Sequence, residues 1–244
     1  MKNINWINIW INLRLLLIFC AVIFLMAFTS NRNNNRKLTK SVVEFEGIDN
    51  QFVPSTIVNK LLICNANTVQ NLQKLNLNLN KIEKSINAHK MIEHAEVFVS
   101  IDGVLKTIVK QRTPIARFFS SNGSFYIDCQ GTKMPLSPQL SARVPLVFGE
   151  LNSRNKATVF TFLKYIFDDD FLKKSIVSIS ISNKDDLLLK IRNYDFDLEF
   201  GKCQNVETKF NNYKAFFQKT SQDSTIDNYK KISLKYDHQV VGTK

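Results

Sequence analysis

The sequence predicts an α+β protein with a single N-terminal transmembrane helix, a β-α-α-β-β domain, and a mixed curved β-sheet domain with helices on one side. Three observations predict it: an apolar run near the N-terminus, a strand-helix-helix-strand-strand order after it, and short alternating strands around two amphipathic helices in the C-terminal half. Hydrophobic residues make up 44% of the 244, with 19 Phe among them, so the chain can bury a substantial core.

The transmembrane helix is predicted from the apolar run Leu15–Phe28. At 1.5 Å per residue this run covers about 21 Å of a hydrocarbon core of roughly 30 Å. Extension back through Trp10, Ile11 and Leu13 gives a sufficient length, and Trp6 and Trp10 suit the interfacial aromatic belt. We therefore expect a tail over residues 1–10, a transmembrane helix over 11–30 and a linker over 31–40.

A cleaved signal peptide is the competing interpretation of this run. The nearest small-x-small cleavage site, Ala27-Phe28-Thr29, is poor, which favours an uncleaved anchor. Orientation stays open from local charge, because Lys2 and Arg14 before the run are outnumbered by basic residues soon after it. Those later residues are Arg32, Arg36, Lys37 and Lys40.

The first domain is predicted from a strand at Val42–Glu46, a helix opened by Pro54, and a second helix with Leu79, Ile82 and Ile86 on one face. Two β-rich runs follow, Ala95–Ile101 and Val104–Val109, on either side of Asp102-Gly103. Asp-Gly between such runs predicts a hairpin with a type I′ turn, in which both central residues have positive φ.

The second domain is predicted to contain a helix at Ala157–Phe167 with Phe160, Leu163 and Phe167 inward, and a later helix at Val206–Phe217. Its strands are expected at 115–119, 124–127, 144–148, 177–181, 187–191, 196–200 and 232–241. In the last strand one row holds Ile232, Leu234, Tyr236 and His238, and the other holds Ser233, Lys235, Asp237 and Gln239.

A family resemblance lies in the stretch IEKSINAHKMIEHAEVFVSIDGVLKTIVKQRTPIARFF, residues 82–119. It resembles the POTRA domain and exit segment of the bacterial cell-division family FtsQ/DivIB, and the ending YKKISLKYDHQVVGTK resembles a Bacteroidetes-type member. Tyr126-Ile127-Asp128, Gly131 and Met134–Ser137 resemble the start of that family's β domain. The resemblance implies a POTRA domain over residues 41–112 and an FtsQ-type β domain over 113–244.

Catalytic, cofactor and metal sites are not predicted. His89 and His94 are five residues apart, outside the spacing that places two metal ligands on one helical face. Asp168-Asp169-Asp170 could bind a cation, but a solvated turn is the more common role for such a run. The net charge of +12 is spread along the chain, which favours a membrane surface or plain solvation over nucleic acid, and no small-molecule substrate is indicated.

Protein binding is the function that the residues favour. A C-terminal strand at a sheet edge could template a partner's strand, although an ordinary strand paired on both sides has the same pattern. The resemblance implies that the last strand and the preceding helix receive the division proteins FtsB and FtsL, and that septal synthases follow. The candidate partner-binding residues are Lys209, Tyr213, Ile232, Ser233, Leu234, Lys235, Tyr236 and Gln239.

The expected function is therefore that of a non-enzymatic divisome scaffold, single-pass in the inner membrane, with a cytoplasmic N-terminus and periplasmic domains. The alternative is a membrane-anchored envelope enzyme acting on cell-wall polymers. That enzyme would need paired carboxylates or a metal in a pocket, which the sequence does not supply in any recognisable pattern.

Overall fold

The structure, a computed structural model, describes residues 6–34, 37–47, 52–64, 77–120, 123–182, 184–237 and 239–244. His238 of the predicted last strand lies outside the described residues. The chain divides into two compact units, which are described separately. Unit 1 holds the chain up to residue 110 apart from a short segment that includes Phe52, and unit 2 holds that segment and residues 111–244.

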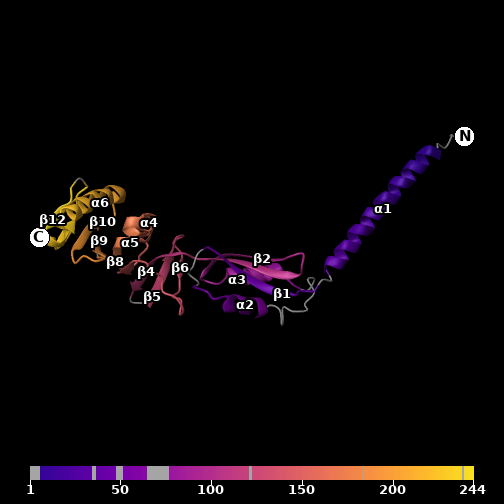
Figure 1. The fold of residues 1–244 in the computed structure, drawn as a ribbon, viewed down its shortest axis with the longest axis horizontal. Helices are drawn as coiled ribbons and strands as arrows, with labels where there is room; N and C mark the ends of the chain where they lie inside the picture. Colours follow the sequence, from indigo (N-terminus) through magenta and orange to yellow (C-terminus); the bar gives the residue numbers. More distant parts are fainter. Residues whose placement is uncertain are drawn as a thin grey trace. The chain divides into compact units, whose positions relative to one another are not determined.

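The N-terminal helix α1 runs over Trp6–Asn34 (Figure 1). Its part from Trp10 to Asn33 is long and apolar enough to cross a membrane, judged by length and composition, and none of that part is buried inside the structure. A helix with apolar side chains all round and no protein packed on it needs an apolar solvent, so α1 fits a single-pass membrane anchor followed by soluble domains.

After α1, the described part of unit 1 has the predicted order of strand, helix, helix, strand and strand. Its elements are β1 (Lys40–Glu46), α2 (Ser55–Cys64), α3 (Leu79–Asn87), β2 (Ile92–Val99) and β3 (Val104–Gln111). The strands form a sheet in the order β1-β3-β2, with β1 parallel to β3. Ile82 and Ile86 of α3 are buried, as the helical spacing predicts. On α2, Val58 is buried and Ile57 is exposed.

The hairpin between β2 and β3 is confirmed, but the predicted type I′ turn is wrong. Gly103 has a φ of +78°, while Asp102 is not among the described residues with positive φ. The Gly103 N–H donates to Ser100 O at 3.1 Å, which closes a turn over Ser100–Gly103 with the glycine last. This is the longer hairpin loop in which only the final residue needs a left-handed conformation.

Unit 2 contains most of the strands. Its elements are β4 (Pro114–Ser120), β5 (Gly123–Asp128), β6 (Lys133–Met134), β7 (Leu146–Phe148), α4 (Lys156–Asp168), α5 (Asp170–Ser175), β8 (Ile176–Ile181), β9 (Asp186–Ile191), β10 (Asp197–Lys202), α6 (Val206–Gln222), a 3₁₀ turn (Ile226–Asn228), β11 (Lys231–Ser233) and β12 (Val241–Thr243). Within the described residues the strands form one mixed sheet in the order β12-β11-β10-β9-β8-β7-β4-β5-β6.

The core of unit 2 lies between this sheet and its helices. A buried row crosses the sheet from strand to strand through register partners: Phe118, Val147, Ile179, Leu189, Leu198 and Ile232. Buried residues of α4, α5 and α6 belong to the same apolar cluster. On α4, Leu163 is buried as predicted, but Phe160 and Phe167 are only partly buried. Val159, Phe162 and Ile166 take the inward positions instead.

The predicted last strand, 232–241, is wrong as a single element. The chain forms two short antiparallel strands, β11 and β12, which pair Lys231 with Thr243 and Ser233 with Val241. Residues 234–237 and 239–240 lie outside the strands, and Asp237 lies in a turn. The alternating sequence pattern runs on beyond the end of β11. Tyr236 fits that pattern, but it lies outside the strand and is 56% exposed.

Candidate functional site

The candidate site is the outer edge of β12, the terminal strand of the large sheet. One side of β12 pairs with β11, and among the described residues no strand pairs with its other side. Residues 241–244 are all exposed. Figure 1 shows β12 and the C-terminus together at this end of the sheet. An edge strand presents unpaired N–H and C=O groups, so this edge can accept a further strand.

The strand beneath this edge is held by burial and by backbone hydrogen bonds. β11 runs parallel to β10, with Ile232 opposite Leu198, and the Ile232 and Leu234 side chains are buried. The Leu234 N–H donates to Glu199 O at 2.7 Å. Ile232 and Leu234 therefore hold the edge in place from inside and do not present their side chains to a partner.

Glu199 of β10 also holds the last hairpin through two ion pairs, which together are called the Glu199 clamp. Its carboxylate lies 2.8 Å from Lys231 Nζ and 3.0 Å from Lys235 Nζ. Hydrogen bonds from these two ammonium groups hold the pKa of Glu199 below its ordinary value. Because β10 carries Glu199 and the C-terminal residues carry both lysines, these ion pairs tie the last hairpin to β10, the strand next to β11.

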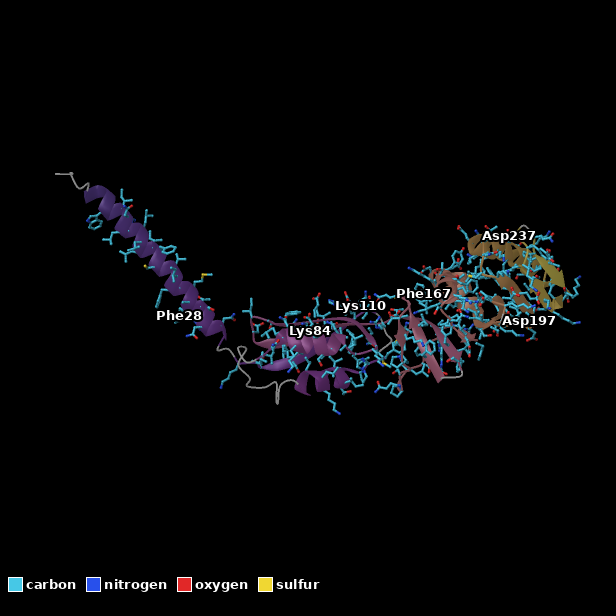
Figure 2. The ribbon with its side chains drawn as sticks, turned by 180° about the vertical axis from the view of Figure 1, so that it is seen from behind. Phe28, Lys84, Lys110, Phe167, Asp197 and Asp237 are labelled. Carbon is cyan, nitrogen blue, oxygen red and sulfur yellow. The ribbon has the colours of Figure 1, made fainter. Side chains whose placement is uncertain are left out.

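The loop between β11 and β12 is attached to α6 through Asp237, which Figure 2 labels. Asn212 Nδ2 donates to Asp237 O at 2.9 Å, and Asn205 Nδ2 donates to the Asp237 carboxylate at 2.7 Å. Asn205 is the N-cap residue of α6 and has a left-handed conformation, with φ +50°. Helix α6 thus fixes the path by which the chain returns to form the edge.

Gly242 allows β12 to lie close to the underlying aromatic layer. A Cβ atom on Gly242 would lie 2.5 Å from Tyr229 Cε1, well inside van der Waals contact. The Tyr229 ring packs against Phe216 of α6, with ring centroids 5.4 Å apart. Only glycine fits at the centre of this edge strand unless the ring or the strand moves.

Two of the predicted partner-binding residues, Lys209 and Tyr213, lie in the core of unit 2. Lys209 is 3% exposed, and its Nζ donates to Phe200 O at 3.3 Å and to Lys202 O at 3.2 Å. Burial lowers the pKa of Lys209 and raises that of Tyr213. Both side chains support the C-terminal sheet from below, and neither is available at the surface.

Among the remaining predicted residues, Lys235, Tyr236 and Gln239 are exposed and Ser233 is partly exposed. The edge strand itself, Val241–Thr243, was missed as a separate element. The polar run Asp237-His238-Gln239 before it is a sequence signal that could have marked the turn.

We expect the Tyr213→Phe variant to leave the free energy of unfolding of unit 2 unchanged or to raise it by up to about 1 kcal/mol. The Tyr213 hydroxyl is buried and has no hydrogen-bond partner among the described residues, so its removal relieves a desolvation cost. Urea denaturation of the full chain, followed by hydrogen exchange of unit 2 peptides, measures the change. Marked destabilisation would show that the hydroxyl has a stabilising partner after all.

Taken together, the fold is that of an apolar helix followed by α+β domains, the last of which ends in an open sheet edge held rigidly from beneath. These features fit the class of single-pass membrane-anchored proteins with a soluble C-terminal domain, and the described residues hold no group of side chains that could bind a metal ion. The family model for "FtsQ/DivIB, C-terminal related" proteins matches residues 113–243, just over half of the chain. The chain belongs to this family, which gives it a role in bacterial cell division.

Among solved structures, the chain is similar to the major extracytoplasmic domain of the trans isomer of the cell-division protein DivIB from Geobacillus stearothermophilus. The two are 11% identical with a TM-score of 0.32, and the match covers 46% of this chain and 96% of that one. No curated protein sequence matches the chain.

Proposed function

We propose that this protein is a non-enzymatic scaffold of the division machinery, which recruits a partner protein by adding a strand of that partner to β12. The observation that carries the proposal is β12, an exposed strand at one edge of the sheet with Gly242 at its centre. Strand addition needs main-chain groups on a rigid edge, and the buried Ile232 and the Glu199 clamp supply the rigidity.

The exposed side chains beside the edge would set the choice of partner. Tyr236 offers an apolar ring with a polar tip, and Lys235 and Gln239 offer charge and hydrogen bonds. In this family role the partners are the division proteins FtsB and FtsL, with septal synthases joining later. A main-chain ladder gives affinity, and these side chains give selectivity.

Membrane anchoring makes a small edge sufficient. In the proposed topology α1 spans the inner membrane, the N-terminus is cytoplasmic, and the POTRA-like unit 1 and the β domain lie in the periplasm. Confinement of two partners to one membrane raises their effective concentration, so a contact over a few residues can hold them together.

Extraction of membranes at alkaline pH tests the anchor: the chain stays in the membrane at its full mass, whereas a cleaved signal peptide would release a shorter protein.

We expect the Gly242→Val variant of the full chain to lose at least about 90% of its recovery of FtsB and FtsL from solubilised membranes, a loss of more than about 1.4 kcal/mol in binding. The new Cβ would lie 2.5 Å from the Tyr229 ring, and because that ring is itself packed against Phe216, we expect β12 to move rather than the ring. The core below should remain, because residues 241–244 are exposed and only β11 pairs with β12.

A matched control makes room for the added atom. Replacing Tyr229 with alanine removes the ring that the Cβ would meet, so Gly242→Ala combined with Tyr229→Ala should bind better than Gly242→Ala alone. Tyr236→Ala separates side-chain recognition from main-chain pairing, since Tyr236 is exposed and lies outside both strands. Full recovery of both partners by Gly242→Val would rule out β12 as the binding edge.

A further inference from the structure

The tip of the β2–β3 hairpin in unit 1 exposes a large apolar side chain. Ile101 is 84% exposed, more than the most exposed described apolar side chain of the anchor helix, Met26, at 75%. The anchor helix has a bilayer to cover it, whereas Ile101 lies in a loop of an otherwise well-packed domain. Water contact with an aliphatic side chain of this size is unfavourable, so a surface that covers it would stabilise the complex.

This tip is fastened to the chain directly after the anchor. The Thr39 N–H donates to Gly103 O at 2.9 Å, and the Thr39 hydroxyl donates to the same oxygen at 3.2 Å. A Cβ on Gly103 would lie 2.8 Å from Lys37 O, so the two backbones are in direct contact. Lys37 also lines a shallow surface hollow with Ile101 and Asp102.

Covalent reach then limits how far the tip can move from the bilayer. Helix α1 ends at Asn34, and Lys37 follows three residues later, so their Cα atoms are at most about 11 Å apart in any arrangement of the linker. The polar end of α1 after Phe28 adds about 9 Å of helix, comparable with the thickness of one headgroup layer of roughly 5–8 Å. The tip therefore stays close to the headgroups wherever the rest of unit 1 points.

Charge around the tip favours a lipid surface over other occupants. Arg32, Arg36, Lys37 and Lys40 follow the apolar run Leu15–Phe28, and no acidic residue occurs between Ser30 and Val43. Asp102 is the single carboxylate of the loop Ser100–Gly103. A cluster of basic residues immediately beside a membrane span attracts anionic headgroups, and an apolar side chain among them can enter the boundary between headgroups and acyl chains.

We propose that the β2–β3 hairpin tip is a second membrane contact, in which Ile101 enters the lipid interface while Lys37 and Lys40 bind anionic headgroups. The inference rests on the anchor assigned above to α1. Two attachments, one through α1 and one through the tip, restrict the rotation of unit 1 about the linker. The tip thereby sets the height at which unit 1 stands above the bilayer.

The test uses the full chain in lipid vesicles, with one thiol per variant carrying an environment-sensitive fluorophore and the other cysteines replaced by alanine. The thiol is Ile101→Cys at the tip, Lys90→Cys as the matched site at the opposite end of β2, or native Cys20 in α1. Lipids with a nitroxide at the headgroup or upper acyl chain quench fluorophores in the interface, and lipids with a nitroxide low on the acyl chain quench a fluorophore near the bilayer centre, as on Cys20. We expect at least about twofold stronger quenching at position 101 than at position 90, and a further increase in anionic vesicles.

A second label keeps the native isoleucine. With the fluorophore on Asp102→Cys, adding Ile101→Glu should reduce quenching by about half, because a charged side chain avoids the interface. Equal quenching at positions 101 and 90, with strong quenching at Cys20, would overturn the tip contact and leave the anchor standing. Absence of quenching at Cys20 would overturn both.

Discussion

Replacing Phe162 with alanine is expected to lower the free energy of unfolding of unit 2 by about 3–5 kcal/mol. Phe162 lies on α4, is fully buried, and contacts two other aromatic rings. Its ring centroid is 4.8 Å from that of Phe200 on β10 and 5.5 Å from that of Phe210 on α6. The substitution therefore opens a cavity where the two long helices and the sheet meet.

The matched control is Phe148→Ala, which removes the same atoms from the surface. Phe148 stacks on Phe119 with centroids 5.3 Å apart, but it is 43% exposed. Its loss should cost no more than about 1 kcal/mol, since little buried area is removed. Urea denaturation with hydrogen exchange of unit 2 peptides compares the two variants. Similar costs for both would mean that the ring cluster is not the centre of the core.

The helical period of the sequence did not identify Phe162 as a core residue of α4. The helical period placed α4 correctly within one residue at each end, yet it assigned Phe160 and Phe167 to the core. Positions 160, 162 and 167 are all Phe and equally apolar, so the face of α4 that packs into the core depends on the residues of other elements that contact it. Those partners, Phe200 and Phe210, come from elements 38 and 48 residues later in the chain.

The prediction of a single C-terminal strand was wrong for a related reason. A run with two-residue alternation predicts one strand, and Ile232 and Leu234 do share one face of it, although both are buried in the core and not at a partner surface. The turn that ends the run depends on Asn205 and Asn212 of α6, which hold Asp237. Such a contact between separate elements leaves no periodic signal in the residues of the turn itself.

Lys209 illustrates how a non-local contact can reverse an expectation about a side chain. A lysine on an amphipathic helix ordinarily points to solvent. Here a register shift between Glu199 and Gly201 interrupts the β9–β10 ladder, and Gly201 has a φ of +73°. The carbonyls of Phe200 and Lys202 beside this irregularity accept hydrogen bonds from Lys209, which makes its burial possible.

Replacing Asp128 with alanine is the second change with a large expected effect, a loss of about 3–5 kcal/mol in the stability of unit 2. Asp128 is 1% exposed, and its carboxylate lies 2.6 Å from Arg112 Nη1. The other carboxylate oxygen accepts from Gln130 N at 3.0 Å and from Thr132 N at 2.7 Å. One side chain thus pairs a cation and closes the turn between β5 and β6.

These contacts give a physical reason for two motifs that the sequence offered only as a resemblance. Arg112 belongs to the Gln-Arg-x-Pro segment before β4, and Asp128 ends the Tyr-Ile-Asp segment of β5. Their pairing joins the first residues of unit 2 to its first hairpin. Gly131, at φ +78°, supplies the left-handed residue that the Asp128–Thr132 turn needs.

The loss of stability in Asp128→Ala arises mainly because a partly buried cation and two backbone N–H groups lose their partner. Arg112 has an 18% exposed side chain and would keep only a 3.4 Å contact with Gln130 Oε1 among its described partners, while the two N–H groups of the turn lose their acceptor. Asp128→Asn retains an oxygen for those N–H groups and should cost less than alanine. Lys190→Ala breaks the partly exposed ion pair with Asp197, whose side chains are 54% and 34% exposed, and should cost under about 1 kcal/mol, which separates a buried pair from a more solvated one. If Asp128→Ala and Lys190→Ala destabilised unit 2 equally, the Arg112–Asp128 pair could not be what holds the start of the sheet together.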